Sequence, residues 1–515
     1  MQVGERGIAG RLGRRGFLIG GAAAAGALVT GCGGSSGSSA GGSIDSFSAV
    51  MEGSGADEAF DPGTSHMFID EARLKAVYDG LFEVDDQMKP IPRLAERAEP
   101  NADGTRWRLA LRDARWHDGS TFTGDDVLYT ISRILGGGEP DAFIAATTLE
   151  HVNLRESRVV DPRTVEIALK KPDFEFRTAL AAYGTRIVQN GTRDFVDPVG
   201  TGPFRFESFE PGKEFSGTSY EQHWNGAPAI RQLRILSADS DARLNTLQGG
   251  QADFADSITP AAARTLRGND RVAVNTTPNS GIHYFAMKTD RPPFDNPDVR
   301  RALMLLADRE EMVKVAFEGE GDVSNDVFGA GFEYYAELPQ HGYDPQRAKT
   351  LLRRAGAENL RFDLFTAEVS SGLVEAAHLF AEHAAKAGVR VNVVVGSKDT
   401  YYSETLDRGE LTMGQSGPLP VPNHFASRLV TGSPQNRTNW SDPEFDALFA
   451  RAQATRSDEE RAAIYRRMHE IQYDRGGFIF FANTYWHNAA NAEYRGIPTG
   501  VPNSFGWVRF DDVTG

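Results

Sequence analysis

The chain of 515 residues contains a single cysteine, Cys32. A lone thiol has no partner within the chain, so no intrachain disulfide can hold the fold together. Sites that need several thiolates are excluded for the same reason, namely zinc ribbons, CxxC redox centres and iron–sulfur clusters bound by cysteines. The fold must therefore rest on the packing of apolar side chains, and a hydrophobic content of 40% over this length is enough for several cores.

Residues 1–31 are typical of a bacterial export signal. Four arginines precede an apolar run over 17–29, which is shorter than the roughly 20 residues that span a bilayer. The run ends at Val29-Thr30-Gly31-Cys32, which resembles a lipobox, where the signal is cleaved before a cysteine that is then acylated. Residues 13–19 resemble a twin-arginine motif, so we expect export by that route, with the general secretory route as the alternative.

Residues 32–43 are predicted to be a lipidated cysteine followed by a Gly/Ser tether. The alternative is an ordinary cysteine buried in a hydrophobic helix, although such a residue would have no need of the tether. Cleavage after residue 31 would remove four arginines and one glutamate and take the net charge from −16 to −19. Anionic headgroups would repel that body, so we expect the lipid to hold it at the outer face of the cell membrane, on the periplasmic side.

Charge and motifs exclude several classes of function. The 71 acidic residues against 55 Lys and Arg disfavour a groove for long nucleic acids. A phosphate-binding GxxxxGK[ST] string and an HExxH zinc helix are absent from the sequence. The one GxSxG string lies in the tether at 33–37, where no strand precedes it and no helix follows it. The sequence therefore predicts no catalytic residue, no metal site and no cofactor.

Two histidine-containing groups have simpler interpretations than catalysis. Trp116-His117-Asp118-Gly119 is favoured as a hairpin whose Asp-Gly makes the turn. His378 and His383 are five residues apart and do not share a helical face, so solvated or capping roles are expected for them. A pair of carboxylates of the glycosidase kind stays open, because its members need not be neighbours in the chain.

Hydrophobic periodicity divides the mature chain into a strand-rich part and an α/β part. Strand patterns occur at 107–111, 164–169, 204–209 and 233–236, and a helix with a capping box is predicted from Thr123. From about residue 290, helices alternate with strands such as 389–395 and 478–481. Each of three helices is predicted to start where a cap residue precedes a proline, at Asn296, Asp344 and Asp442. The sequence therefore predicts α/β architecture.

Six strings, in order, resemble one family, the extracytoplasmic solute-binding proteins of peptide and nickel ABC importers, family 5. The longest runs over 107–127 and contains the Trp116 to Gly119 turn. The others lie at 78–81, 199–204, 247–253, 293–303 and 308–309, with 343–356 behind them. Each string is short, but their order behind a lipobox makes the resemblance specific.

The resemblance implies a two-lobed, periplasmic-binding-protein-like α/β fold of type II that closes over a solute. It implies a larger lobe over 44–280 with an extra sub-domain, a smaller lobe over 281–488, and a return to the larger lobe over 489–515. Two chain crossings would form the hinge. Most of the quoted motifs are structural by their own chemistry, since glycines and prolines shape turns and the apolar residues fill cores.

The resemblance also suggests where a solute would bind. Peptide binders of this family hold the amino terminus of the ligand with an aspartate in a loop of the smaller lobe, and the corresponding segment 413–423 contains no Asp, Glu or Trp. This departure weakens the case for a free α-amine and leaves Gln415 and Asn423 as polar candidates. His424 is a candidate for holding a nickel chelate, against the alternative of a solvated loop histidine.

Arg186, which follows Tyr183, falls near the position where some members place an arginine against a ligand carboxylate. The alternative is a surface arginine paired with a neighbour. Aromatic candidates for stacking on the solute, some of which are expected to be core residues, are Tyr284, Phe285, Trp440, Tyr485 and Trp486.

The sequence thus predicts a lipid-anchored, non-enzymatic receptor that is monomeric. It would capture a peptide-like or other small polar solute and present it to the permease and ATPase subunits of an ABC importer. The alternatives are a secreted lipoprotein hydrolase on a similar body and a surface scaffold without a ligand. Convergent polar groups in a cleft without a nucleophile and base would favour the receptor.

Overall fold

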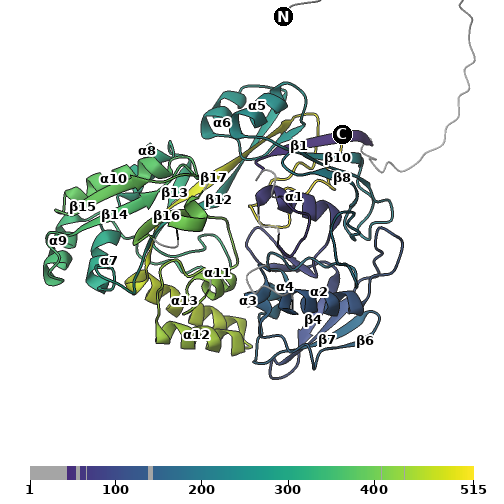
Figure 1. Ribbon diagram of the computed structural model, residues 1–515, viewed down its shortest axis with the longest axis horizontal. Helices are drawn as coiled ribbons and strands as arrows, with labels where there is room; N and C mark the ends of the chain where they lie inside the picture. The colour runs from purple at the N-terminus through teal and green to yellow at the C-terminus, as the bar shows by residue number, and fades with distance from the viewer. Residues whose placement is uncertain are drawn as a thin grey trace, which may run out of the picture. The chain divides into compact units, whose positions relative to one another are not determined.

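The computed structural model describes residues 43–53, 58–64, 67–136, 143–398, 400–406, 409–433 and 435–515 (Figure 1). The predicted signal, Cys32 and the tether up to residue 42 lie outside the described residues. From residue 43 onward, the described residues form one compact unit. In the part of the chain that is described, no helix is both long and apolar enough to cross a membrane.

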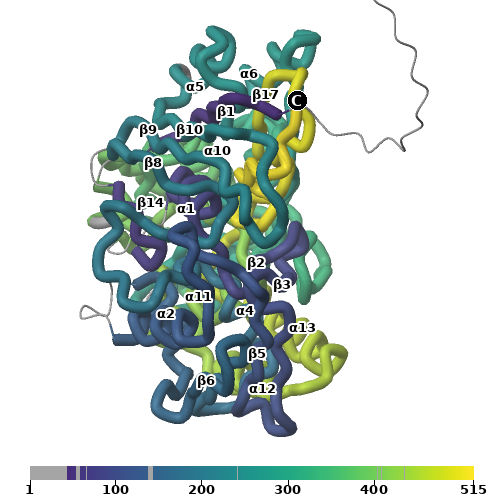
Figure 2. Tube along the Cα trace, turned by 90° about the vertical axis from the view of Figure 1, so that its right-hand side faces the viewer, coloured from purple at the N-terminus to yellow at the C-terminus, as the bar shows by residue number. Residues whose placement is uncertain are grey.

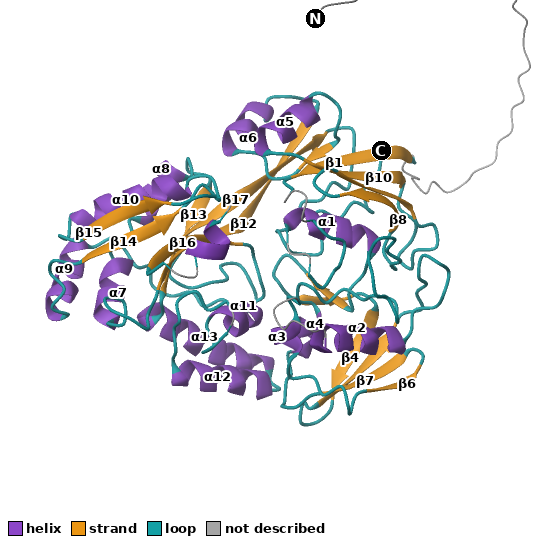
Figure 3. Cartoon of the chain, in the orientation of Figure 1, coloured by secondary structure: helices purple, strands orange, loops and turns teal. Residues whose placement is uncertain are grey.

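A large mixed sheet runs through this unit in the order β15-β14-β16-β12-β17-β11-β1-β10-β9-β8, with β13 beside β17 (Figure 3). In that order its strands are β15 (Arg390–Val395), β14 (Arg361–Thr366), β16 (Leu411–Ser416), β12 (Val272–Met287), β17 (Phe478–Asn491), β11 (Phe254–Ala255), β1 (Ile44–Met51), β10 (Ile230–Ser237), β9 (Glu214–Ser219) and β8 (Phe204–Glu210), and β13 is Gly321–Val323.

The two longest strands of this sheet, β12 and β17, join its two halves. They are antiparallel, with Val272 opposite Asn491 at one end and Ala286 opposite Phe478 at the other. The first end lies beside β11 and the second beside β16. Their register shifts between Thr277 and Gly281. The two halves of the sheet are thus joined by neighbouring strands of one ladder.

We call the elements before β12 the larger lobe and those between β12 and β17 the smaller lobe. The larger lobe contains a second sheet of order β4-β5-β7-β6, which shares one core with helix α2. The elements not yet given are β2 (Phe82–Val84), β3 (Pro90–Pro92), β4 (Ala95–Pro100), β5 (Arg106–Leu111), β6 (Arg158–Asp161), β7 (Thr164–Ala168), α1 (Phe68–Val77), α2 (Gly124–Gly136), α3 (Ala146–Leu149), α4 (Phe176–Leu180), α5 (Ser240–Gln248) and α6 (Pro260–Leu266).

The elements between β12 and β17 form the smaller lobe, in which helices lie around β14, β15 and β16 (Figure 1). Its helices are α7 (Pro297–Met304), α8 (Arg309–Ala316), α9 (Pro345–Arg354), α10 (Leu373–Ala385), the π-helix η1 (Tyr401–Thr405), α11 (Val421–Arg428), α12 (Pro443–Ala454) and α13 (Asp458–Arg475). The chain after β17 returns to β1, where Trp507 and Phe510 pack in one core with Phe47 (Figures 1 and 2). The residue limits predicted for the lobes stay a prediction.

The predicted helix starts are confirmed where the signal is local. The side chains of Asn296, Asp344 and Asp442 each accept a backbone N–H in the first turn of α7, α9 and α12, with a proline at the first turn. Ser457 caps α13 in the same way. The pattern Ser441-x-x-Glu444 also predicts a capping box, but that prediction is wrong, because Asp442 caps the helix instead.

The alternation of side chains along β12 and β17 separates two cores. Phe285 and Phe481 pack under α8 and α10 with Phe380, whereas Tyr284 and Phe480 face a second core. That second core also contains Val84 and Met88 of the larger lobe. Apolar side chains of both lobes are therefore in contact.

The turn at Trp116 to Gly119 is structural, as predicted. The backbone of Trp116 pairs with Ser120, and the neighbouring His117 is buried. Nδ1 of His117 accepts the N–H of Gly200, so its Nε2 donates to the carbonyl of Gly202. Burial lowers the pKa of His117 to about 4. His117 therefore joins two of the family-like strings and serves as a neutral packing residue.

Candidate functional site

A small cavity of about 30 Å³ lies between the lobes, and we call it the interlobe cavity. Its larger-lobe wall comes from α1, β2 and the segment after α4, and its smaller-lobe wall comes from the segment between β16 and α11. Its apolar lining includes Phe82, Val84, Met88 and Leu419, and its polar lining includes Glu71, Glu83, Tyr183, Arg186, Asn423 and Asn503.

A wider groove of about 480 Å³ opens next to it, between α3 and α4 of the larger lobe and α11 and α12 of the smaller lobe. We call it the outer groove. Its polar lining includes His151, Asp173, Glu175, Asp446 and Gln453. Asn423 lines both the cavity and the groove, and its Nδ2 donates to the carbonyl of Thr178 at 3.4 Å. Asn423, at the start of α11, is therefore part of the wall of both spaces.

Arg186 lies in the cavity wall and is buried, so it is not the surface arginine of the alternative interpretation. Its two terminal nitrogens donate to the two carboxylate oxygens of Glu71 at 3.0 and 2.9 Å, and Glu83 lies 3.3 Å away. Burial alone would lower the pKa of Arg186, but the two glutamates together raise it above its ordinary value. The guanidinium fork is thus already occupied by a carboxylate of the chain.

Lys75 lies on α1 behind the same wall. Its ammonium group donates to the carbonyls of Ser504 and Trp507 at 2.6 and 2.8 Å. Burial lowers the pKa of Lys75 to about 8, against the opposing effect of Glu71 and Glu83. Lys75 is thus a buried cation whose hydrogen-bond partners are backbone carbonyls.

Three of the predicted site residues, Tyr183, Arg186 and Asn423, meet at the interlobe cavity. The hydroxyl of Tyr183 donates to the carbonyl of Met67 at 3.1 Å, and burial raises the pKa of Tyr183. The segment 413–423 that was singled out is the end of β16, a short connection and the start of α11. It forms the smaller-lobe wall through Pro418, Leu419, Pro420 and Asn423.

His424 is not a solvated loop residue, because it is fully buried on α11. Its ring is stacked on Phe328, with ring centres 3.7 Å apart. Burial and the nearby Arg428 lower its pKa. Both ring nitrogens face inward without a hydrogen-bond partner, so His424 offers no ligand atom to a chelate in this conformation.

Other candidates lie away from the cavity lining. Tyr284 is buried with its ring against Gly414, and Gln415 is half-buried on β16. Phe285 and Trp440 are core residues, packed on Phe380 and Phe445 respectively. The remaining two are Trp486, whose indole donates to Asp256 in the larger-lobe core, and Tyr485, whose hydroxyl donates to Asp322.

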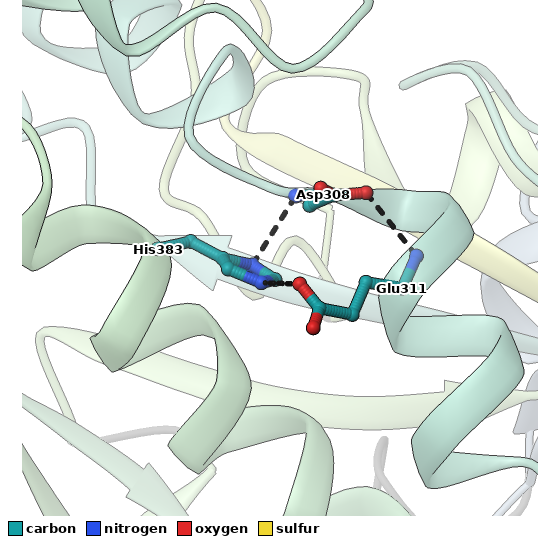
Figure 4. A group of neighbouring side chains, drawn as sticks. All are labelled: Asp308, Glu311 and His383. Atoms are coloured by element: carbon teal, nitrogen blue, oxygen red, sulfur yellow. Dashed lines mark hydrogen bonds and ion pairs between the residues drawn. The ribbon is translucent and has the colours of Figure 1, made fainter.

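One group of neighbouring carboxylates and a histidine has the spacing of a metal site, but its contacts are those of a helix cap (Figure 4). Asp308 accepts the N–H of Glu311 at the start of α8. His383 of α10 accepts the N–H of Asp308 through Nδ1 and donates through Nε2 to Glu311 at 2.8 Å. The capping role expected for His383 is confirmed, and His378 is exposed as expected.

Sequence reasoning missed Glu71, Glu83 and Lys75. Glu71 is 115 residues from Arg186, and no local pattern signals such a pairing. Glu71 and Lys75 belong to α1, which is buried on all sides from Ile69 to Val77, and Glu83 belongs to a strand of three residues. Neither element has a periodic pattern that would single these residues out.

Comparison with known proteins places the chain among bacterial transport proteins. The sequence model described as "Bacterial extracellular solute-binding proteins, family 5 Middle" matches residues 89–437. The heme-binding protein A of Haemophilus influenzae is 28% identical over 495 residues, which are 88% of each chain. The dipeptide-binding protein of Escherichia coli is 24% identical over 516 residues, covering 92% of this chain and 95% of that one.

A solved structure has the same fold. NikZ from Campylobacter jejuni in complex with Ni(L-His) superposes with a TM-score of 0.79 at 21% identity, covering 92% of this chain and 99% of that chain. The two-lobed α/β fold predicted from the sequence is therefore confirmed.

Proposed function

Because the chain belongs to the family 5 bacterial extracellular solute-binding proteins, we propose that it captures a small polar solute between its lobes and delivers it to the permease of an ABC importer. The solute would be peptide-like or of another small polar class. The observation that carries the proposal is the interlobe cavity, whose walls come from segments more than 200 residues apart in the chain, at 71–88 and 418–423. Hydrolysis of ATP would belong to the partner subunits of the importer.

The size of the cavity indicates how a solute would enter. About 30 Å³ holds one or two water molecules, whereas sites for small organic ligands usually have about 300–1,000 Å³. The outer groove of about 480 Å³ reaches that range and adjoins the cavity at Asn423. A solute would enter when the lobes move apart and be enclosed when they close.

The lining favours binding over catalysis. Of the described residues that line the interlobe cavity, none is a serine, cysteine or histidine, so the nucleophile and base of a hydrolase are not paired there. The relatives compared above carry the names of binding proteins.

We extend the proposal to the location of the chain. A lipid on Cys32 would tether the body to the outer face of the cell membrane, on the periplasmic side, and the tether over 32–43 would let it reach the permease. The variant Cys32→Ala should lose labelling by a fatty-acid probe in bacteria and either leave the membrane or keep its signal. Unchanged lipid labelling would contradict the anchor.

The test of binding is a thermal-shift screen with peptides, sugars, opines and metal chelates, followed by calorimetry on the hits. A ligand that binds only the folded state raises the melting temperature. At a ligand concentration 100 times its Kd, binding adds about 2.7 kcal/mol to the free energy of unfolding. Small-angle scattering should show a more compact chain with the hit than without it. If no compound of the panel raises the melting temperature and none changes the scattering curve, the proposal that the chain is a solute receptor is contradicted.

A further inference from the structure

The chain after β17 contributes one side chain to the wall of the interlobe cavity. Asn503 lines the cavity together with residues of both lobes. The segment that carries it is packed on the larger lobe, because Trp507 lies in one core with Phe47 of β1. The C-terminal return therefore places a polar side chain where the two lobes meet.

Hydrogen bonds hold the backbone next to Asn503 on the larger lobe. The hydroxyl of Ser504 donates to Oδ1 of Asp86, between β2 and β3, at 2.7 Å. The N–H of Phe505 donates to the carbonyl of Val84 at 2.6 Å, and Val84 itself lines the cavity. Asn503 is thus anchored to the larger lobe and would stay with it when the lobes separate.

The side chain of Asn503 reaches across to the smaller lobe. Its Nδ2 donates to the carbonyl of Pro418 at 2.9 Å, and Pro418 belongs to the smaller-lobe wall of the cavity between β16 and α11. The reverse orientation of the amide would set two oxygens against each other, since both would be acceptors. This bond therefore ties the smaller-lobe wall to the C-terminal return.

Gly417, the residue before Pro418, is fitted to the same contact. A Cβ at this position would lie 2.8 Å from Nδ2 of Asn503, which is too close, and 3.5 Å from Phe68, which is an ordinary contact distance. The φ of Gly417 is not positive, so the backbone conformation does not demand a glycine here. The absence of a side chain at Gly417 is explained by the close approach of Asn503.

Resting on the proposed function, we propose that Asn503 is a positioning residue that holds the segment from Pro418 to Pro420 over the solute when the lobes close. One partner of the contact is anchored to the larger lobe, and the other two, Gly417 and Pro418, belong to the smaller lobe. The contact can therefore exist only while the lobes are together. Release of a solute would require the bond between Asn503 and Pro418 to break.

The experiment measures the separation of the lobes in the full chain without any solute. Cys32 is the only cysteine, so replacing it with serine leaves the chain free for two introduced labels. Cysteines at Ala102 in the larger lobe and Thr350 on α9 of the smaller lobe, both exposed, carry the two fluorophores. Single-molecule energy transfer between them then gives the ratio of closed to open chains.

Two asparagines provide a matched pair of variants. Asn503 has a φ of +70°, which glycine adopts without strain, so Asn503→Gly removes the side chain and leaves the backbone undisturbed. Asn439→Gly is the control. Asn439 has a φ of +51°, and its side chain donates to Asp290 at 3.0 Å, away from the cavity lining.

Asn503→Gly should lower the ratio of closed to open chains roughly 2- to 10-fold, as expected for one lost hydrogen bond, and Asn439→Gly should leave it unchanged. Gly417→Ala should also lower the ratio, because its methyl group displaces Nδ2 of Asn503. In the Asn503→Gly background, Gly417→Ala should have no effect, since the two residues act through one contact. If Asn503→Gly does not fold, Asn503→Asp and Gly417→Ala decide, because a carboxylate cannot donate to the carbonyl of Pro418.

The result that overturns the role of Asn503 is distinct from the failure of the receptor. An unchanged ratio in the Asn503 variants, or an equal effect of Gly417→Ala in both backgrounds, would overturn the inference, as would a wild type whose lobes are always apart. These distances are measured without a solute. A thermal-shift screen without a hit would therefore contradict the proposed function independently of them.

Discussion

Glu175 gives the sharpest test of how the two lobes are packed together. It lies just before α4 in the larger lobe and is 8% exposed. Its carboxylate accepts a hydrogen bond from the hydroxyl of Tyr465 on α13 of the smaller lobe, and Arg461 of the same helix lies 3.4 Å away. Burial raises the pKa of Glu175 to about 8, although the charge of Arg461 opposes the rise.

The magnitude follows from the difference between this pKa and the ordinary value of 4.5. A shift of one pKa unit corresponds to about 1.36 kcal/mol. Raising the pKa of Glu175 from 4.5 to about 8 therefore corresponds to a change of about 5 kcal/mol in the free energy of unfolding. Because the pKa is higher in the folded chain, the folded state binds more protons between these two values. The contribution of Glu175 to the free energy of unfolding should therefore be largest below pH 4.5, fall by about 1.4 kcal/mol per pH unit as the pH rises toward 8, and level off above it.

The variant Glu175→Gln removes the titration and keeps a neutral side chain of the same size. The free energy of unfolding is measured in urea by tryptophan fluorescence from pH 4.5 to 9. The value for Glu175→Gln minus the value for the wild type should increase by several kcal/mol as the pH rises over this range. Glu459→Gln, an exposed glutamate in the first turn of α13, controls for the loss of one charge. If the free energy of unfolding depends on pH in the same way for Glu175→Gln and the wild type, the buried contact between the lobes is refuted.

Three further substitutions test a close backbone contact, a buried ion pair and a helix cap. Gly200→Ala should prevent stable folding, because its Cβ would lie 1.7 Å from the carbonyl oxygen of Val77, whereas Gly136→Ala, with nothing within 4 Å, should change the melting temperature little. Arg186→Gln should lower the free energy of unfolding by about 3–5 kcal/mol in urea, since it leaves the buried Glu71 without its cation and close to Glu83. A loss below 1 kcal/mol would show that the Arg186–Glu71 pair is not buried in solution. Asp344→Ala should cost about 1 kcal/mol by the same measurement, as for other helix N-caps, and no loss would argue against the cap.

Features fixed by neighbours in the chain could be predicted from the sequence. A side chain that caps a helix acts on residues two or three positions away, so Asn296, Asp344 and Asp442 were identified from their own surroundings. The hairpin at Trp116 to Gly119 depends on an equally local turn. The strand predicted at 478–481 is the start of the longer β17, because its continuation contains polar residues that pair with β12 rather than a hydrophobic run.

The solute site could be predicted only in part, because its residues are brought together by packing between the lobes. Tyr284 and Phe285 are neighbours on β12, yet their side chains face opposite cores, and aromatic composition alone does not assign those faces. Arg186 was found, but its partner Glu71 could not be, so a guanidinium that is already paired looked available for a solute.

The strings that identify the family and the residues that would choose the solute are almost entirely different. His117, Gly200 and Gly202 join two of the strings by hydrogen bonds and close packing on α1, and of all the quoted strings only the one at 78–81 reaches the cavity lining, through Gly80. A match to the family therefore shows that the fold is shared. It leaves the cavity wall free to differ among relatives whose names give heme, dipeptides or nickel as the solute. We propose that charge and shape at Arg186 and Asn423 select the solute, which is why a screen of chemically different solutes is more informative than a closer match in sequence.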